Sequence, residues 1–267
     1  MKIGIIGFGY VGSAVGWAHK HQDQIIRDPK LKDSRALSEF ANVDAIFVCL
    51  PSPMLEDGRC DTSYLENGLD DLFSTVKFEN PVPVICKTTA PPSVYERLQE
   101  KYPNIVYSPE FLTAANNIAD YSNAGFFVIG GNPIWCDRAR DVIRTGVPVT
   151  DQNFVYTDIK TASLFKYMMN SYMSMKVTFM NDFYNLCRAE GIEWRSMKKL
   201  ASLDDRIGRT HMDVPGPDGQ FGYGGACFPK DVAAIITEAI DLDVDFELMQ
   251  RVETINKRHR NKNNEPI

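Results

Sequence analysis

Near its N-terminus the chain reads Lys2-Ile3-Gly4-Ile5-Ile6-Gly7-Phe8-Gly9-Tyr10-Val11-Gly12, and this segment is the strongest indication of the fold. Its first half is typical of a short buried strand, and its second half is a G-x-G-x-x-G motif that leads into helical spacing. The first glycine of such a motif permits a tight turn, the second lets a pyrophosphate approach the backbone, and the third allows close helix–strand packing. The stretch therefore predicts a phosphate-binding loop, for which the alternative is a glycine turn with no ligand.

An acidic residue near the end of the second strand would support dinucleotide binding. The second strand is predicted over residues 24–27, and Asp28 follows it directly. A carboxylate at this point accepts hydrogen bonds from a ribose diol and repels a 2′-phosphate. The sequence therefore predicts an NAD site rather than an NADP site, with cofactor contacts from Gly7, Gly9, Tyr10, Val11, Gly12 and Asp28.

Strand-like and helix-like segments alternate through the first half of the chain. Apolar strands are predicted over residues 44–50, 82–88, 105–107 and 126–129, and helices over 61–76, 91–101 and 134–144. This alternation is typical of a doubly wound parallel sheet with helices on both faces. We expect a Rossmann-type NAD-binding domain over residues 1–150.

The pattern changes near residue 150. No glycine or proline occurs from Asp158 to Glu190, and Gly191 follows. A helix of this span would be ~50 Å long at about 1.5 Å per residue. We expect an all-helical domain over residues 151–256, built on this long helix, and a solvated basic tail over 257–267. The apolar residues of the helix occupy more than one stripe, which favours a homodimer formed through it.

Composition narrows the class of protein further. The 267 residues are 44% hydrophobic with a net charge of -6, which is ordinary for a globular protein and argues against nucleic acid or an anionic membrane as a partner. No apolar run reaches the ~18–20 residues of a membrane span, and no signal peptide is recognisable. The six cysteines have no C-x-x-C pair and no metal-ligand spacing, so we expect reduced thiols, a cytoplasmic location and no metal site.

One cysteine lies in an unusual setting. Five glycines occur within residues 216–225, and Cys227 follows them, just before a helix expected to begin at Pro229. A thiol beside Lys230 and a helix N-terminus has its thiolate favoured. The alternative is that Cys227 is a small buried hydrophobic residue, which is the common role of a free cysteine.

Lys166 and Asn170 are four residues apart on the predicted long helix and therefore share one face. Lys166 lies among apolar neighbours, so its side chain either extends to solvent or serves a site.

Several motifs in this order resemble the UDP-glucose/GDP-mannose 6-dehydrogenases, and together they span residues 2 to about 256. Besides the glycine motif they are Cys49-Leu50-Pro51-Ser52-Pro53, Asp57-Gly58, Lys87-Thr88-Thr89-Ala90-Pro91, Ser108-Pro109-Glu110-Phe111-Leu112, Lys166 with Asn170, Asp205-Arg206-Ile207-Gly208, and Gly224-Gly225-Ala226-Cys227-Phe228-Pro229-Lys230-Asp231. The resemblance implies oxidation of the C6 alcohol of a nucleotide sugar to a carboxylate with two NAD+.

The resemblance also implies a role for each matching residue. Cys227 would be the nucleophile that forms a thiohemiacetal and then a thioester, while Lys166 and Asn170 would stabilise oxyanions. Glu110, Thr89 and Asp231 would handle protons and the hydrolytic water. Further cofactor contacts would come from Pro51, Thr89 and Lys230. Substrate contacts would come from Phe111, Leu112, Lys166, Asn170, Tyr223 and Gly224, and from Arg206 reaching the neighbouring subunit.

The chain departs from the family pattern at several points. The second acid of the family is Ala114 here, an arginine before one strand is Phe126, and the cysteine loop is longer by residues 218–221. Family members continue into a third domain that holds much of the nucleotide, and this sequence ends where that domain would begin. We therefore expect another surface to anchor the substrate, or a smaller substrate.

Two other functions remain open. The β-hydroxyacid dehydrogenases share the fold and a lysine–asparagine pair, but they perform one two-electron oxidation without a cysteine. A catalytically idle NAD-binding relative is the third reading, motivated by Ala114 and the missing domain. Two NADH per product would support the nucleotide-sugar dehydrogenase function, and one NADH per product would support the β-hydroxyacid dehydrogenase function.

Overall fold

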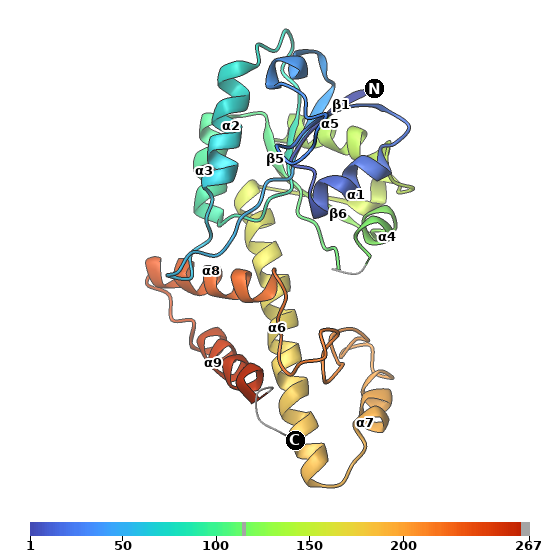
Figure 1. Cartoon of the computed structure of the whole chain (residues 1–267), viewed down its shortest axis with the longest axis vertical. Coiled ribbons are helices and arrows are strands. Elements are labelled where there is room, and N and C mark those ends of the chain that lie inside the picture. Colours follow the sequence, from blue (N-terminus) through green and yellow to red (C-terminus); the bar gives the residue numbers. More distant parts are fainter. Residues whose placement is uncertain (114–115, 263–267) are drawn as a thin grey trace. The chain divides into compact units, whose positions relative to one another are not determined.

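The structure, a computed structural model, describes residues 1–113 and 116–262 (Figure 1). It consists of two compact units. The first contains Met1–Pro53 and Asp61–Lys166, and the second contains Met54–Cys60 and the chain from Tyr167 onward.

The first unit is built on a seven-stranded sheet in the order β2-β1-β3-β4-β5-β6-β7. The strands are β1 (Lys2–Ile6), β2 (Asp23–Arg27), β3 (Ala45–Val48), β4 (Val84–Cys86), β5 (Ile105–Tyr107), β6 (Phe127–Gly131) and β7 (Phe154–Thr157). The first five run parallel, as the sequence predicts, with Ile6 opposite Arg27 and Val48 opposite Cys86.

One pairing corrects the prediction of a wholly parallel sheet, because β6 runs antiparallel to β5. In the described part of the connection between them, the one helix is the short α4 (Asn117–Ser122), which does not carry the chain back to the other end of the sheet. Strand β7, which the sequence pattern did not predict, then pairs with β6 in parallel.

Helices cover both faces of the sheet (Figure 1). One face packs against α2 (Ser63–Thr75), α3 (Pro92–Lys101), the short 3-10 helix Leu37–Asn42 and the first turns of α6. The opposite face packs against α1 (Tyr10–Ala18), α4 and α5 (Pro133–Arg144). In β3, Ile46 and Val48 contribute to the first layer and Ala45 and Phe47 to the second, which is the alternation of a strand buried on both sides.

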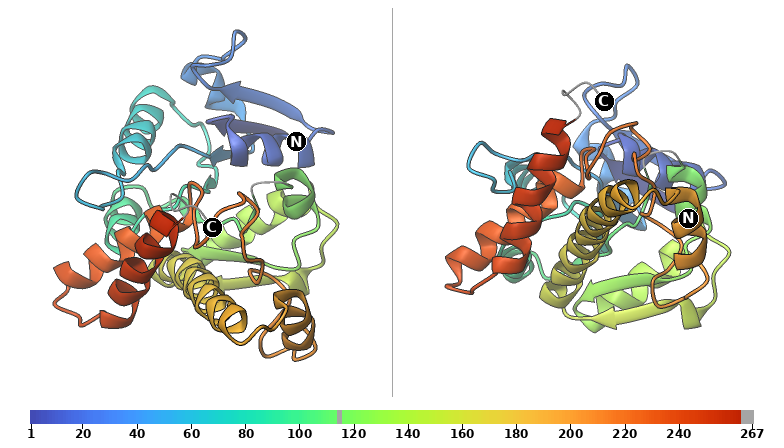
Figure 2. Two further views of the ribbon diagram at one scale, coloured as in Figure 1. Left: turned by 60° about the horizontal axis from the view of Figure 1, so that its bottom comes forward. Right: turned by 90° about the horizontal axis from the view of Figure 1, so that it is seen from below.

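The second unit is helical, as predicted. Its helices are α6 (Ile159–Ala189), which enters it at Tyr167, α7 (Trp194–Ala201), α8 (Phe228–Asp241) and α9 (Glu247–Lys262). Helix α6 has 31 residues and Gly191 follows it with a φ of 70°, so the predicted long helix and its glycine stop are confirmed. Helices α8 and α9 lie side by side (Figure 2) around Val232, Ile236, Met249 and Val252.

Two predicted boundaries look different in three dimensions. The first unit extends past residue 150, because β7 joins the sheet and Ile159 and Ala162 of α6 pack in its core. The expected solvated tail is the end of α9 up to Lys262, where His259 is buried and contacts Asp182 at 3.0 Å. Residues 263–267 lie outside the described residues.

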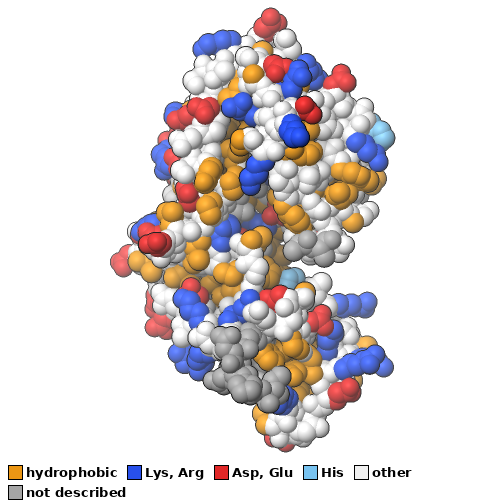
Figure 3. Space-filling model, in the orientation of Figure 1, with side chains coloured by type: hydrophobic (Ala, Val, Ile, Leu, Met, Phe, Trp, Pro, Cys, Tyr) orange, Lys and Arg blue, Asp and Glu red, His pale blue; other side chains and the backbone are white. Residues whose placement is uncertain are grey.

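The surface carries side chains of both charge signs (Figure 3). Basic and acidic side chains are interspersed on the face drawn in Figure 3. Within the described part of the chain, no helix is both long and apolar enough to cross a membrane. The six cysteines are free thiols.

Candidate active site

The glycine loop after β1 has the geometry of a phosphate cradle. Gly7 has a φ of 85°, and a Cβ on it would lie 2.5 Å from the carbonyl oxygen of Cys49. A Cβ on Gly12 would lie 2.0 Å from the carbonyl oxygen of Gly7, whereas a Cβ on Gly9 would meet nothing within 4 Å. The first and third glycines are therefore required by the turn and the packing, and the second leaves space where a pyrophosphate would approach. The residues present fit a dinucleotide.

Asp28 lies at the end of β2 beside this loop. Its Oδ2 accepts a hydrogen bond from the Phe8 N–H at 2.7 Å, and its Oδ1 accepts one from the Lys30 N–H at 2.9 Å. These two backbone bonds hold the pKa of Asp28 below its usual value. The carboxylate is therefore ionised at neutral pH, and its remaining lone pairs are available to a ribose diol.

Three further segments reach the same edge of the sheet, because they follow parallel strands. Pro51 follows β3 and is exposed, Thr89 follows β4 and is buried, and Glu110 follows β5. The Thr88 hydroxyl donates to the Leu50 carbonyl oxygen at 2.9 Å and so ties two of these segments together. Ligands of such sheets bind outside the carboxyl ends of the strands, so the predicted cofactor residues of the first unit share one edge.

Lys166, the last residue of the first unit, does not extend to solvent. It is 4% exposed, and its Nζ donates to the Glu110 carbonyl oxygen at 2.6 Å and approaches Oε1 of the same residue at 3.3 Å. It also lies 5.2 Å from the centroid of the Phe111 ring. Glu110 in turn accepts from the Leu112 N–H at 2.7 Å. The buried Lys166 and the partly buried Glu110 therefore form an ion pair, and the solvent-directed alternative for Lys166 is wrong.

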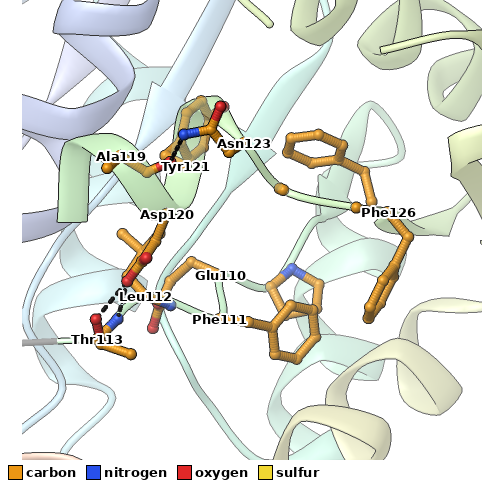
Figure 4. A pocket seen from close by; sticks show the side chains of 13 residues that line it. Glu110, Phe111, Leu112, Thr113, Ala119, Asp120, Tyr121, Asn123 and Phe126 are labelled. Carbon is orange, nitrogen blue, oxygen red and sulfur yellow. Dashed lines mark hydrogen bonds between the residues drawn. The ribbon is translucent and has the colours of Figure 1, made fainter. Parts of the chain in front are cut away.

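A pocket of about 320 Å³ lies beside this pair, between the loop after β5 and the segment from α4 to β6 (Figure 4). Glu110, Phe111 and Leu112 contribute to its lining, and the ring of Phe126 lies 5.4 Å from that of Phe111. Phe126 thus makes this wall of the pocket aromatic. Asp120 accepts from the Thr113 N–H at 2.7 Å and fixes the end of the loop. Ala114, another of the expected departures, lies outside the described residues.

The second unit holds the remaining polar groups. Asn170 on α6 donates through Nδ2 to the Asp231 carboxylate at 2.5 Å, and Lys230 pairs with the same carboxylate. Asp231 is 1% exposed, so this carboxylate is buried with two partners. Sequence spacing placed Asn170 correctly on the helix, and the structure adds Asp231 as its partner.

Cys227 occupies the N-cap position of α8, one residue before the helix begins at Phe228 rather than at the predicted Pro229. Its side chain is exposed, and its carbonyl oxygen accepts from the Asp231 N–H at 2.9 Å. The buried-hydrophobe alternative is therefore wrong, and the thiol lies at the positive end of a helix, as the sequence predicted.

The glycine-rich loop before Cys227 is held by groups that the sequence did not reveal. Asn256 on α9 accepts from the Tyr223 N–H at 2.6 Å and donates to its carbonyl oxygen at 3.0 Å. Asn181 on α6 accepts from the Gly222 N–H at 3.0 Å, and Arg260 pairs with Asp218 at 2.7 Å. These anchors come from helices far along the chain, and no local spacing marks them.

The other predicted substrate residues of the second unit, Tyr223, Gly224 and Arg206, differ from one another in burial and in contacts. The Tyr223 side chain is buried against Val232 and Ile236, where burial raises the pKa of its phenol, and Asn256 bonds both of its backbone groups. A Cβ on Gly224 would lie 2.4 Å from the Arg260 guanidinium. The Arg206 side chain is 90% exposed and pairs with Asp204 at 2.6 Å.

No group of three or more histidine, cysteine or carboxylate side chains that could hold a metal ion occurs among residues 1–113 and 116–262.

Two family models match this chain. Residues 23–143 match the NAD binding domain of the UDP-glucose/GDP-mannose dehydrogenase family, and residues 160–258 match the central domain of the same family. The two matches fall on the sheet unit and on the helical unit with the start of α6.

Individual relatives agree with these matches. The chain is 30% identical over 248 residues to the UDP-glucose 6-dehydrogenase of Rickettsia bellii, covering 89% of this chain and 55% of that protein. The chain thus spans about half the length of the curated relatives it matches.

Solved structures share the fold. The UDP-glucose dehydrogenase of Pyrobaculum islandicum superimposes with a TM-score of 0.79 at 23% identity, over 96% of this chain and 68% of that one. The 3-hydroxyisobutyrate dehydrogenase of Mycobacterium tuberculosis superimposes with a TM-score of 0.73 at 14% identity, over 97% of this chain and 94% of that one.

Proposed function

The chain belongs to the UDP-glucose/GDP-mannose dehydrogenase family, whose NAD-binding and central domains it contains, and from this premise we propose that it is a nucleotide-sugar 6-dehydrogenase. It would oxidise the C6 alcohol of the sugar to a carboxylate in two successive two-electron steps. Bound NAD+ supplies the electron acceptor for each oxidation. The glycine loop would hold its pyrophosphate and Asp28 its ribose.

The observation that carries the proposal is the exposed Cys227 at the start of α8. In the proposed reaction its Sγ adds to the C6 aldehyde and forms a C–S bond, giving a thiohemiacetal. The second oxidation turns this adduct into a thioester. Water then attacks the carbonyl carbon, the C–S bond breaks, and the carboxylate leaves as the thiol is regenerated. Each sugar therefore consumes two NAD+ and one water.

The other polar groups would stabilise charge and move protons. Lys166 carries a buried ammonium and Asn170 a buried amide, and both can stabilise the oxygen at C6 when it bears negative charge. Glu110 and Asp231 would accept protons or orient the hydrolytic water, with Thr89 near the cofactor. Because a cysteine adduct is not needed for a single oxidation, the loop that presents Cys227 favours this function over a two-electron dehydrogenase.

The test is a thermal-shift panel of UDP-sugars and GDP-sugars with NAD+, followed by product analysis of any hit. A bound ligand raises the melting temperature by linkage. Two NADH per sugar acid would support the proposal, and one NADH per carbonyl product would favour a β-hydroxyacid dehydrogenase activity. A hit without NADH formation would indicate a catalytically idle relative.

A further inference from the structure

Lys87 is a buried cation to which the proposed reaction gives no part. It follows β4 directly and is 2% exposed. Its Nζ donates to the Ser108 hydroxyl at 3.0 Å and lies 5.3 Å and 5.7 Å from the ring centroids of Tyr121 and Phe127. Among the residues that the structure describes, no carboxylate oxygen lies within 4.0 Å of this Nζ, which is the distance limit for an ion pair. A lysine without a counter-ion in a core is costly for the fold, which favours a functional role for it.

The titratable groups that face Lys87 come from four elements. Burial raises the pKa of Cys49, after β3, to about 12, and raises the pKa of Tyr121 on α4, so both stay neutral. Burial lowers the pKa of His19, after α1, so it is neutral at neutral pH. Glu110, after β5, is the one negative charge among the groups that act on Lys87 within the described residues. Burial lowers the pKa of Lys87 itself to about 8.

The topology puts this cation on one half of the cofactor edge. The strand order reverses between β1 and β3, with β2 on one side and β3, β4 and β5 on the other. A dinucleotide lies across such a switch point, with its adenosine ribose at the acid after β2, here Asp28. The nicotinamide half therefore belongs to the ends of β3, β4 and β5, and Lys87 is the first residue after β4.

We propose that the buried ammonium of Lys87 sets the preference of the cofactor site for reduced over oxidised nicotinamide. The oxidised ring carries a positive charge and the reduced ring does not, so a fixed cation in a poorly solvated core disfavours the oxidised form. Lys87 would act through its field and would not touch the substrate. The inference rests on the proposed NAD binding and extends it to the energetics of the bound couple.

The experiment measures the dissociation constants of NAD+ and NADH by calorimetry from pH 6.5 to 9.5. In the wild-type protein we expect the ratio of the NAD+ constant to the NADH constant to fall about tenfold as the pH rises through about 8. In Lys87→Met the ratio should be low at every pH. Lys101→Met is the matched control, because it removes an exposed lysine of α3 that pairs with Asp70, and it should behave as wild type.

A second variant keeps the proposal testable if Lys87→Met fails to fold. Ser108→Ala retains the cation and removes its hydrogen-bond acceptor, so the fall in the ratio should move to lower pH. A wild-type protein that binds both dinucleotides with a ratio of dissociation constants that does not depend on pH, and that neither variant changes, is the contrary result. This result would overturn the inference about Lys87 and leave the proposed function standing. Wild-type protein that binds neither NAD+ nor NADH would overturn the proposed function together with it.

Discussion

At the scale of the residue, Cys227 differs from the other cysteines in what surrounds it. Four of them are buried, and the half-buried Cys49 has its pKa raised to about 12 by burial. Cys227 is exposed at a helix N-terminus, where a thiolate is stabilised. We predict that mild iodoacetamide treatment alkylates Cys227 first, as read by mass spectrometry of tryptic peptides. Faster labelling of any other cysteine would contradict the reactive-thiolate assignment.

The substitution Cys227→Ser tests the covalent step. A serine hydroxyl is far less acidic than a thiol and forms an aldehyde adduct poorly, so turnover should fall by several orders of magnitude while NAD+ affinity stays nearly constant. Steady-state kinetics and calorimetry measure the two effects. A fully active Cys227→Ser protein would show that the thiol takes no part in a covalent step and would favour the two-electron dehydrogenase function.

Asp28 should decide between NAD+ and NADP+. Its pKa is held below its usual value by the Phe8 and Lys30 N–H groups, so its charge persists from neutral pH down to mildly acidic pH. We expect NADP+ to bind at least ~10-fold more weakly than NAD+, which is about 1.4 kcal/mol. Asp28→Asn keeps an oxygen acceptor for the loop but removes the charge, so the difference between the NAD+ and NADP+ affinities should become smaller. Equal wild-type affinity for the two cofactors would refute the assignment.

Lys87 also predicts a dependence of stability on pH. Its pKa is about 8 in the folded protein, against a usual value of 10.5, so between these two pH values the unfolded chain binds more protons. The free energy of unfolding should therefore rise with pH over this interval, by about 3 kcal/mol from this group.

Urea melts of wild type and Lys87→Met at pH 7.5 and 9.5 isolate this contribution, because other groups titrate equally in both proteins. Below pH 8 the variant should be the more stable protein, since an apolar side chain replaces a buried charge. A difference in the free energy of unfolding between the two proteins that does not change with pH would show that Lys87 is not a buried cation.

At the scale of the element, local signals were sufficient for some features and not for others. The strand β1, its glycine loop and α1 could be predicted because the turn chemistry lies within twelve consecutive residues. Helix α6 could be predicted because its interior lacks glycine and proline. The antiparallel direction of β6 could not be predicted, since strand direction depends on the path of the connection through α4. The buried state of Lys87 depends on Ser108, Tyr121 and Phe127, which only tertiary packing brings together.

The loop that presents Cys227 should depend on its anchor in α9. Asn256 is 6% exposed and bonds both backbone groups of Tyr223, so Asn256→Ala leaves buried polar groups unpaired. We expect a loss of about 1–3 kcal/mol in the free energy of unfolding. Turnover should fall with unchanged NAD+ affinity, because the loop loosens while the sheet unit is intact.

Lys257→Ala is the control for this change, since Lys257 lies on the same helix and makes an exposed pair with Glu253. It should alter stability by less than about 0.5 kcal/mol. Equal effects of the two variants on turnover would mean that Asn256 does not position the loop.

At the scale of the whole molecule, the residues of the proposed reaction are shared between the two units. Glu110 and Lys166 belong to the first, and Asn170, Cys227 and Asp231 to the second. The spacing of Lys166 and Asn170 was informative because one continuous helix carries both. The pairing of Asn170 with Asp231 was not foreseen from spacing, because 61 residues separate them in the chain.

The surface of α6 carries an exposed apolar stripe. Six large apolar side chains along it are exposed, and their spacings of three, four and seven residues place them on one stripe: Leu164, Met168, Tyr172, Phe179, Phe183 and Leu186. Monomers rarely expose contiguous apolar patches beyond a few hundred Å². We predict a homodimer, or a higher even oligomer, formed through this stripe. Light scattering at micromolar concentration should give at least twice the chain mass of 30.1 kDa.

The double variant Phe179→Glu with Phe183→Glu should give a mass of 30.1 kDa, because two charges on the stripe cannot be buried against a second copy. Leu248→Glu is the control, since Leu248 is an exposed apolar residue of a different helix, α9, and the oligomer should survive the change. A monomeric wild-type protein would refute the prediction. It would also remove any role for Arg206 at a neighbouring subunit, since no neighbour would then be present for its exposed guanidinium to reach.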